Sequence, residues 1–264
     1  MDFLEALLLG LVQGITEWIP VSSTGHLVLV QEALGIPPSE HILFDLILHA
    51  ATLLSVTFFL RKELKKIILS ALTEKSKLDE GGIRARKLGW FAILATIPAA
   101  AAGLLAGEHI EEMFTATATA IALLLTGALL WLAEMPWLRK RRDRLRTKDA
   151  LMIGCFQAFS IFPGISRSGS TIASGCYLGF TREMVAIFSF LMSIPIILAG
   201  IIYGVFFLET IELDWPITLS AAFVAALTGY FALKWLFSII QKYRLRIFAA
   251  YCWVVGVIAL ILLA

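Results

Sequence analysis

Two short polar segments interrupt long apolar stretches of this sequence. The first, QGITEWIPVSSTGH, covers residues 13–26, and the second, QAFSIFPGISRSG, covers residues 157–169. Each has a proline followed by serine and glycine, a combination that ends one helix and begins another. A helix that begins after such a break turns its free backbone N–H groups and its positive dipole end toward the break, where they bind phosphate well. The two segments therefore predict a pair of anion-binding helix ends.

Each segment also carries one charged residue, Glu17 in the first and Arg167 in the second. A charged side chain at mid-bilayer costs about 2.5–3.5 kcal/mol, so we expect these two to pair with each other or with a ligand. A structural ion pair alone would leave the surrounding hydroxyls and glycines unexplained. The guanidinium is also a planar fork that suits bidentate contact with phosphate.

The small residues after each break are the expected contacts to phosphate. They are Ser22, Thr24 and Gly25 in the first segment and Ser166, Ser168 and Gly169 in the second. Ser23 or His26 is expected to attack phosphorus or to activate water, and the sequence does not rank them. Glu17 is expected to be a base, to orient one, or to hold a metal. Close helix packing is the simpler explanation for small residues in a membrane, but it does not explain Arg167.

Two further pairs are spaced four residues apart, which places each pair on one helix face. Gln13 and Glu17 could share a divalent cation through amide and carboxylate oxygens, with a diphosphate supplying more oxygens. Asp45 and His49 either complete the same cavity or stabilise helix packing, and both interpretations stay open.

Composition indicates the surroundings of these residues. The chain is 59% hydrophobic and 16% charged, against roughly 45–50% and 25% in an average soluble domain. Several apolar runs approach or exceed the roughly 20 residues that cross a bilayer. The net charge of +2 is too small to suggest nucleic acid as a partner. The sequence therefore predicts an integral membrane protein.

The apolar runs predict an all-α polytopic protein with six transmembrane helices, at about 42–60, 88–107, 115–137, 184–208, 216–238 and 246–264. Regions 1–34 and 150–180 are apolar but are interrupted by the two polar segments. Irregular backbone at membrane depth survives only where protein or a water-filled cavity surrounds it. We therefore expect both regions to form re-entrant helical hairpins.

The basic residues predict the orientation. If the hairpins enter and leave on one side, 21 of the 22 Lys and Arg residues fall on one face, mostly in loops 61–87 and 138–149. The positive-inside rule makes that face cytoplasmic, which places both termini outside. The halves 1–137 and 150–264, joined by the basic loop 138–149, then have opposite orientation within one transmembrane domain. Such inverted repeats form binding sites where their broken helices meet. Most of the seven tryptophans lie near expected span ends, as interfacial anchors do.

The two segments resemble the signature segments of the bacitracin-resistance undecaprenyl pyrophosphate phosphatase family. The first matches its (E/Q)xxxE motif running into PVSSTGH, the second matches its PGxSRSG motif, and FDLILHAATL follows the first hairpin as expected. The resemblance implies removal of the terminal phosphate from a C55 isoprenyl pyrophosphate, with a divalent cation such as Mg²⁺ or Ca²⁺. It also implies an active site that opens toward the outer face. With the charge bias, it implies a bacterial inner-membrane location, and an archaeal plasma membrane would give the same signal. The family's motif residues fall on Gln13, Glu17, Ser23, Thr24, His26, Ser166 and Arg167.

One position departs from the commoner family pattern. Many members have Glu where this chain has Gln13, and a metal site with one carboxylate should bind its ion more weakly. A transporter or flippase for a phosphorylated lipid is the main alternative function, because inverted repeats with broken helices are typical of carriers. An inert scaffold is the third. Substrate and membrane lipids are the expected partners, and a homodimer is left open.

Overall fold

The computed structural model describes residues 1–106, 113–135, 142–207, 213–240 and 244–263. Helices make up almost all of the regular structure in these residues, as the sequence predicts, and one isolated bridge joins Arg142 and Phe180. The α-helices are α1 (Phe3–Thr16), α2 (Ser23–Ala33), α3 (Ile42–Phe59), α4 (Arg61–Leu72), α5 (Glu80–Ala106), α6 (Ala116–Leu132), α7 (Thr147–Ala158), α8 (Arg167–Tyr177), α9 (Arg182–Phe207), α10 (Trp215–Ile239) and α11 (Arg246–Leu262). Short 3₁₀ turns are η1 (Pro38–His41), η2 (Lys75–Lys77) and η5 (Phe159–Ile161).

A helix coincides with each of the six expected apolar runs, namely α3, α5, α6, α9, α10 and α11. In the described part of the chain, α3, α5, α9 and α10 are long and apolar enough to cross a membrane by length and composition. The apolar helices α6 and α11 have 17 residues each, at the lower limit for a bilayer crossing. These helices make the chain an integral membrane protein.

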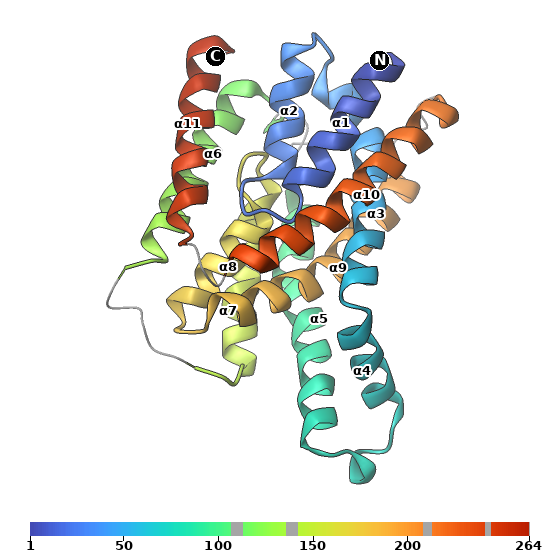
Figure 1. The fold of residues 1–264 in the computed structure, drawn as a ribbon, viewed down its shortest axis with the longest axis vertical. Helices are drawn as coiled ribbons and strands as arrows, with labels where there is room; N and C mark the ends of the chain where they lie inside the picture. The colour runs from blue at the N-terminus through green and yellow to red at the C-terminus, as the bar shows by residue number, and fades with distance from the viewer. Residues whose placement is uncertain (107–112, 136–141, 208–212, 241–243, 264) are drawn as a thin grey trace.

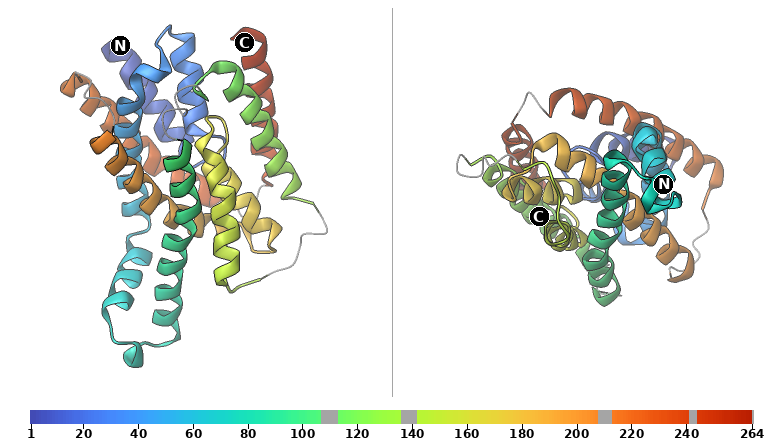
Figure 2. Two further views of the ribbon diagram at one scale, coloured as in Figure 1. Left: turned by 180° about the vertical axis from the view of Figure 1, so that it is seen from behind. Right: turned by 90° about the horizontal axis from the view of Figure 1, so that it is seen from below.

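Both polar segments break the helical chain where the sequence predicts. α1 ends at Thr16 and α2 begins at Ser23, while α7 and η5 end before α8 begins at Arg167. The breaks of the two short-helix pairs lie toward the middle of the molecule (Figures 1 and 2). The breaks are therefore placed where the two halves of the chain meet.

The helices of the two halves pack in corresponding pairs. α1 contacts α10 as α7 contacts α5, and α3 contacts α10 as α9 contacts α5. Glycines permit the α1–α10 contact and the corresponding α7–α5 contact. A Cβ at Gly10 of α1 would lie 2.4 Å from the carbonyl oxygen of Ala221, and a Cβ at Gly154 of α7 would lie 2.4 Å from that of Ala95. Small residues let helix backbones approach closely in membranes.

The expected loop 61–87 is largely helical, which corrects the sequence interpretation. α4 and the first turns of α5 form a hairpin that projects beyond the other helices (Figure 1). Leu64 and Ile67 of α4 share a face and pack against the main core. Arg86 of α5 donates from Nε to the Ser70 carbonyl (2.7 Å), near the end of α4 where carbonyl groups lack helical partners. Parts of the expected connections 107–114, 138–149 and 209–215 lie outside the described residues.

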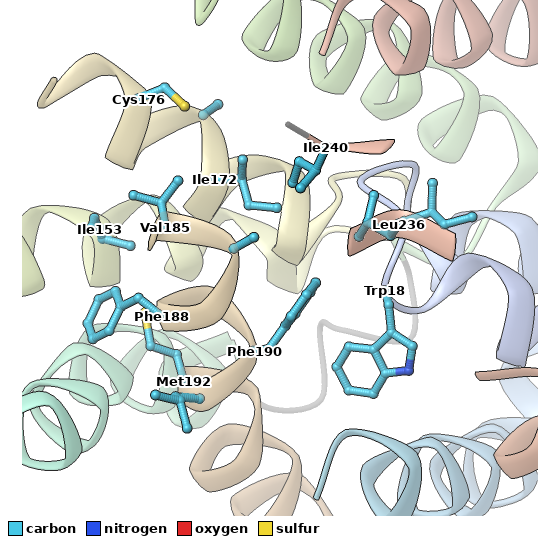
Figure 3. Close-up of a cluster of buried hydrophobic side chains, with 14 of the residues drawn as sticks. Trp18, Ile153, Ile172, Cys176, Val185, Phe188, Phe190, Met192, Leu236 and Ile240 are labelled. Carbon is cyan, nitrogen blue, oxygen red and sulfur yellow. The ribbon is translucent and has the colours of Figure 1, made fainter. Parts of the chain in front are cut away.

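The largest apolar core lies where α8, α9 and α10 meet the first break (Figure 3). Trp18 is fully buried there and meets the Phe190 ring edge-on, with ring centroids 5.5 Å apart. Trp18 is therefore a core residue and not an interfacial anchor. Both termini lie at one end of the molecule, and the basic α4–α5 hairpin lies at the other (Figure 1).

Candidate active site

The two helices that follow the breaks begin with the same capping device. The Ser22 hydroxyl accepts from the Gly25 N–H (3.2 Å) at the start of α2, and the Ser166 hydroxyl accepts from the Gly169 N–H (3.0 Å) at the start of α8. In each helix, the cap satisfies one backbone N–H group of the first turn. The other N–H groups of that turn have no partner within the helix. Both helix ends therefore carry partial positive charge toward the break.

Glycine brings the two breaks into direct contact. A Cβ at Gly25 would lie 2.8 Å from the Cα of Gly164. Gly164 itself has a φ of +95°, which favours glycine, and its carbonyl accepts from the Thr126 hydroxyl (2.9 Å). Thr126 Oγ1 in turn accepts from the Ser166 N–H (3.0 Å). Thr126 could not be predicted from the sequence, because a lone threonine on an apolar helix gives no signal that distinguishes it from a packing residue.

Glu17 is the centre of the polar contacts. Its Oε1 forms the expected ion pair with Arg167, and the two side chains are only 2% and 14% exposed. Its Oε2 accepts from Gln13 Nε2 (3.0 Å) and from the Ser23 hydroxyl (2.5 Å), and His49 Nε2 lies 3.5 Å away. The carboxylate thus links both halves and holds the Ser23 hydroxyl in place.

Arg167 has donors left for a ligand. Its Nη1 is buried and has no hydrogen-bond partner among the described residues, while Nη2 contacts Glu17. The guanidinium carbon also lies 5.7 Å from the centroid of the Trp18 ring, which supports it from one side. A buried, unpaired N–H is costly, so this edge of the guanidinium is suited to an anion.

These groups line a cavity of about 270 Å³. Seven of the predicted site residues are in its wall: Glu17, Ser22, Ser23, Thr24, Ser166, Arg167 and Ser168. Asp45 and His49 line it as well, so they belong to the cavity and not only to helix packing. His49 Nδ1 contacts the Asp45 carbonyl (2.8 Å), and the Asp45 carboxylate accepts from Gln31 Nε2 (2.9 Å).

The structure places four predicted residues outside the cavity wall. Gly25 and Gly169 contribute backbone at the helix starts, and Gln13 is buried behind Glu17. His26 has both ring nitrogens engaged, Nδ1 with the Ser22 carbonyl (2.8 Å) and Nε2 with the hydroxyl of Tyr251 (2.9 Å). The Tyr251 ring also stacks on the imidazole, with an interplanar angle of 7°. His26 is thus directed at α11, which motif spacing could not reveal.

Gln13 and Glu17, the two residues predicted to hold a metal, are joined by a hydrogen bond. They do not form a cation site by themselves. Among the described residues, no group of three or more His, Cys, Asp or Glu side chains is placed to hold a metal ion. The predicted pair offers one carboxylate, Glu17, and the buried carbonyl oxygen Oε1 of Gln13, which has no hydrogen-bond partner among the described residues. This donor set fits a cation such as Mg²⁺ that takes most of its ligands from phosphate and water.

Paired helix starts and a buried guanidinium around one cavity, in a helical membrane protein, have the charge and the N–H donors of an anion-binding site. The family model described as Bacitracin resistance protein BacA matches residues 6–258, and the chain belongs to this family.

Relatives match the chain over its full length. It is similar to an undecaprenyl-diphosphatase of Alkaliphilus metalliredigens, with 40% identity covering 99% of this chain and 98% of the relative. It is 38% identical to one of Methanobrevibacter smithii, which covers 98% of this chain and 96% of the relative. It is 38% identical to one of Korarchaeum cryptofilum, which covers all of both chains. The family resemblance carried by the two motifs is confirmed.

Proposed function

We propose that this protein is an undecaprenyl-diphosphatase, which hydrolyses undecaprenyl diphosphate to undecaprenyl phosphate and inorganic phosphate. The observation that carries the proposal is the convergence of two capped helix starts and Arg167 on one cavity that also holds the Ser23–Glu17 pair. The names and full-length similarity of the relatives point to the same reaction.

Binding of the diphosphate follows from the charges in the cavity. The starts of α2 and α8 present N–H groups and partial positive charge, and Arg167 adds a full charge with a free N–H edge. The groups are fixed by Ser22, Ser166 and Glu17 before the substrate arrives. Preorganised donors of this kind stabilise the charge that spreads over phosphoryl oxygens in the transition state.

Ser23 is the proposed nucleophile. It lines the cavity, and its hydroxyl already donates to Glu17 Oε2, which can accept the proton as the oxygen attacks the terminal phosphorus. The bridging oxygen then leaves with undecaprenyl phosphate, and water cleaves the phosphoserine to release phosphate. His26 is a positioning residue in this scheme, because its contact with the Ser22 carbonyl holds the start of α2.

We further propose a divalent cation, Mg²⁺ or Ca²⁺, which Glu17 and Gln13 would hold together with the substrate. It would neutralise charge on the diphosphate. The N–H groups at the starts of α2 and α8 and the Arg167 guanidinium would contact the phosphate oxygens of the same diphosphate.

The proposed topology has six crossings and two re-entrant hairpins as an inverted repeat, with the termini and the cavity opening on the outer face. Aligning Gln13 with Gln157 also aligns Gly10 with Gly154, and each glycine makes a close backbone contact with a helix of the other half. The corresponding helix contacts and the placement of the basic α4–α5 hairpin opposite the termini support it.

Phosphate release from farnesyl or undecaprenyl diphosphate by detergent-purified protein tests this function. An enzyme releases phosphate without any membrane, whereas a carrier does not. Release that requires protein and disappears in the Ser23→Ala variant is the expected result. An absence of release from folded protein, with and without added Mg²⁺ or Ca²⁺, would contradict the proposal.

A further inference from the structure

The cavity has two chemically different walls. The starts of α2 and α8 form the polar wall. The second wall comes from α3 and α9. It carries Asp45 and His49 but is otherwise apolar, through Ile42, Leu46, Ile196, Ile197 and Gly200. Residues 42 and 46, and likewise 196 and 200, are four apart and so share a helix face. A diphosphate accounts for the polar wall only, so the apolar wall needs a different ligand group.

Gly200 differs from the glycines that helix packing requires. A Cβ at Gly10, Gly25 or Gly154 would lie within 3.0 Å of a backbone atom. Among the described residues, a Cβ at Gly200 would meet only Leu46 Cδ1, at 3.6 Å, which is ordinary van der Waals contact. The missing side chain at position 200 therefore leaves space beside Leu46 instead of allowing two backbones to touch.

The apolar wall is itself partly open at the surface between α3 and α9. Ile42, Leu46, Ile196 and Gly200 are each only partly buried, and both helices are long and apolar enough to cross a membrane. An apolar chain that leaves the cavity between α3 and α9 thus passes from one apolar surface to another. It avoids the cost of placing hydrocarbon against polar groups.

On the basis of the function proposed above, we infer that the first isoprene units of the substrate bind between α3 and α9, and that the small size of Gly200 admits them. Gly200 and Leu46 are then specificity residues that select a prenyl diphosphate over a diphosphate without an apolar chain. The polar wall acts on both kinds of substrate alike.

The test compares Gly200→Leu with Gly103→Leu. Gly103 lies on the apolar helix α5, and no atom of the described residues would lie within 4 Å of an added Cβ there, so it controls for adding the same side chain to a membrane helix. Each variant is assayed for phosphate release from farnesyl diphosphate and from methyl diphosphate. We expect Gly200→Leu to lower kcat/KM at least about tenfold for farnesyl diphosphate and less than about twofold for methyl diphosphate. Gly103→Leu should change neither.

A second set of variants makes the result independent of the folding of Gly200→Leu. Leu46→Phe fills the same space from α3 and should give the same selective loss. Leu46→Ala combined with Gly200→Leu should restore farnesyl diphosphate turnover, because it returns the lost space. Equal losses on both substrates, or no loss in either Gly200→Leu or Leu46→Phe, would overturn the inference and leave the proposed function standing. A folded wild-type protein that cleaves neither substrate would overturn both.

Discussion

Loss of the Arg167 charge should destabilise the protein mainly through the carboxylate that it leaves behind. The Glu17 side chain is 2% exposed, and in Arg167→Met its carboxylate keeps the donors Gln13 and Ser23 and the nearby His49 but loses its arginine partner. Removing one partner of a buried ion pair costs about 3–5 kcal/mol. Because those donors still hold the carboxylate, we expect the free energy of unfolding to fall by about 3 kcal/mol, at the lower end of that range.

A second substitution separates the charge effect from lost packing. In the Glu17→Gln/Arg167→Met double variant both charges are gone, and the free energy of unfolding should return to within about 1 kcal/mol of wild type. Denaturant unfolding in detergent measures these values, with Arg84→Met as a control because Arg84 is exposed on α5. A double variant that is no more stable than Arg167→Met would refute the reasoning, since the buried charge would then not be the cause.

The same variants test whether the pair is more than structural. Phosphate release should fall by about 10²–10³-fold in Arg167→Met and should stay low in the stable double variant, because the guanidinium is missing from the cavity in both. Recovery of phosphate release in the double variant would show that Arg167 serves the fold alone.

Four further predictions concern other parts of the account. Ser23→Ala should lower kcat at least about 10³-fold, and mass spectrometry of quenched wild-type reactions should find the phosphate on Ser23 and not on His26. Gly164→Ala should lower the free energy of unfolding by about 2 kcal/mol or more, because its Cβ would lie 2.3 Å from a backbone oxygen of α6 at a φ of +95°. Asp149→Asn weakens the two hydrogen bonds from Arg142 (2.9 and 2.8 Å), and should cost about 1 kcal/mol in unfolding assays without changing kcat. A chelator should stop phosphate release, Mg²⁺ or Ca²⁺ should restore it, and the unfolding midpoint should not move, because the described residues hold no cluster for a metal.

Much of the site could be predicted because local rules fix it. Proline and serine set where α2 and α8 begin, and the caps at Ser22 and Ser166 follow from residue type. The Glu17–Arg167 pair follows from the cost of leaving either charge alone in an apolar environment. These predictions required no knowledge of which helix packs against which.

The remaining features depend on packing that a uniformly apolar sequence does not reveal. His26 and His49 are both single histidines near polar residues, yet tertiary contacts direct His26 to Tyr251 and His49 to Glu17. Trp18 resembles an anchor by its position and is a core residue in three dimensions. The helix α4 was detectable, since Leu64 and Ile67 repeat with helical spacing among lysines, but its basic composition favoured a loop.

A structure with a bound, non-hydrolysable prenyl methylenediphosphonate would test most directly whether the two helix starts and the Glu17–Arg167 pair form the substrate site. The account predicts both phosphonate groups between the starts of α2 and α8, with Arg167 Nη1 and the Ser23 hydroxyl in contact with the terminal one. Phosphonate groups bound elsewhere, with this cavity left as it is in the free protein, would contradict it.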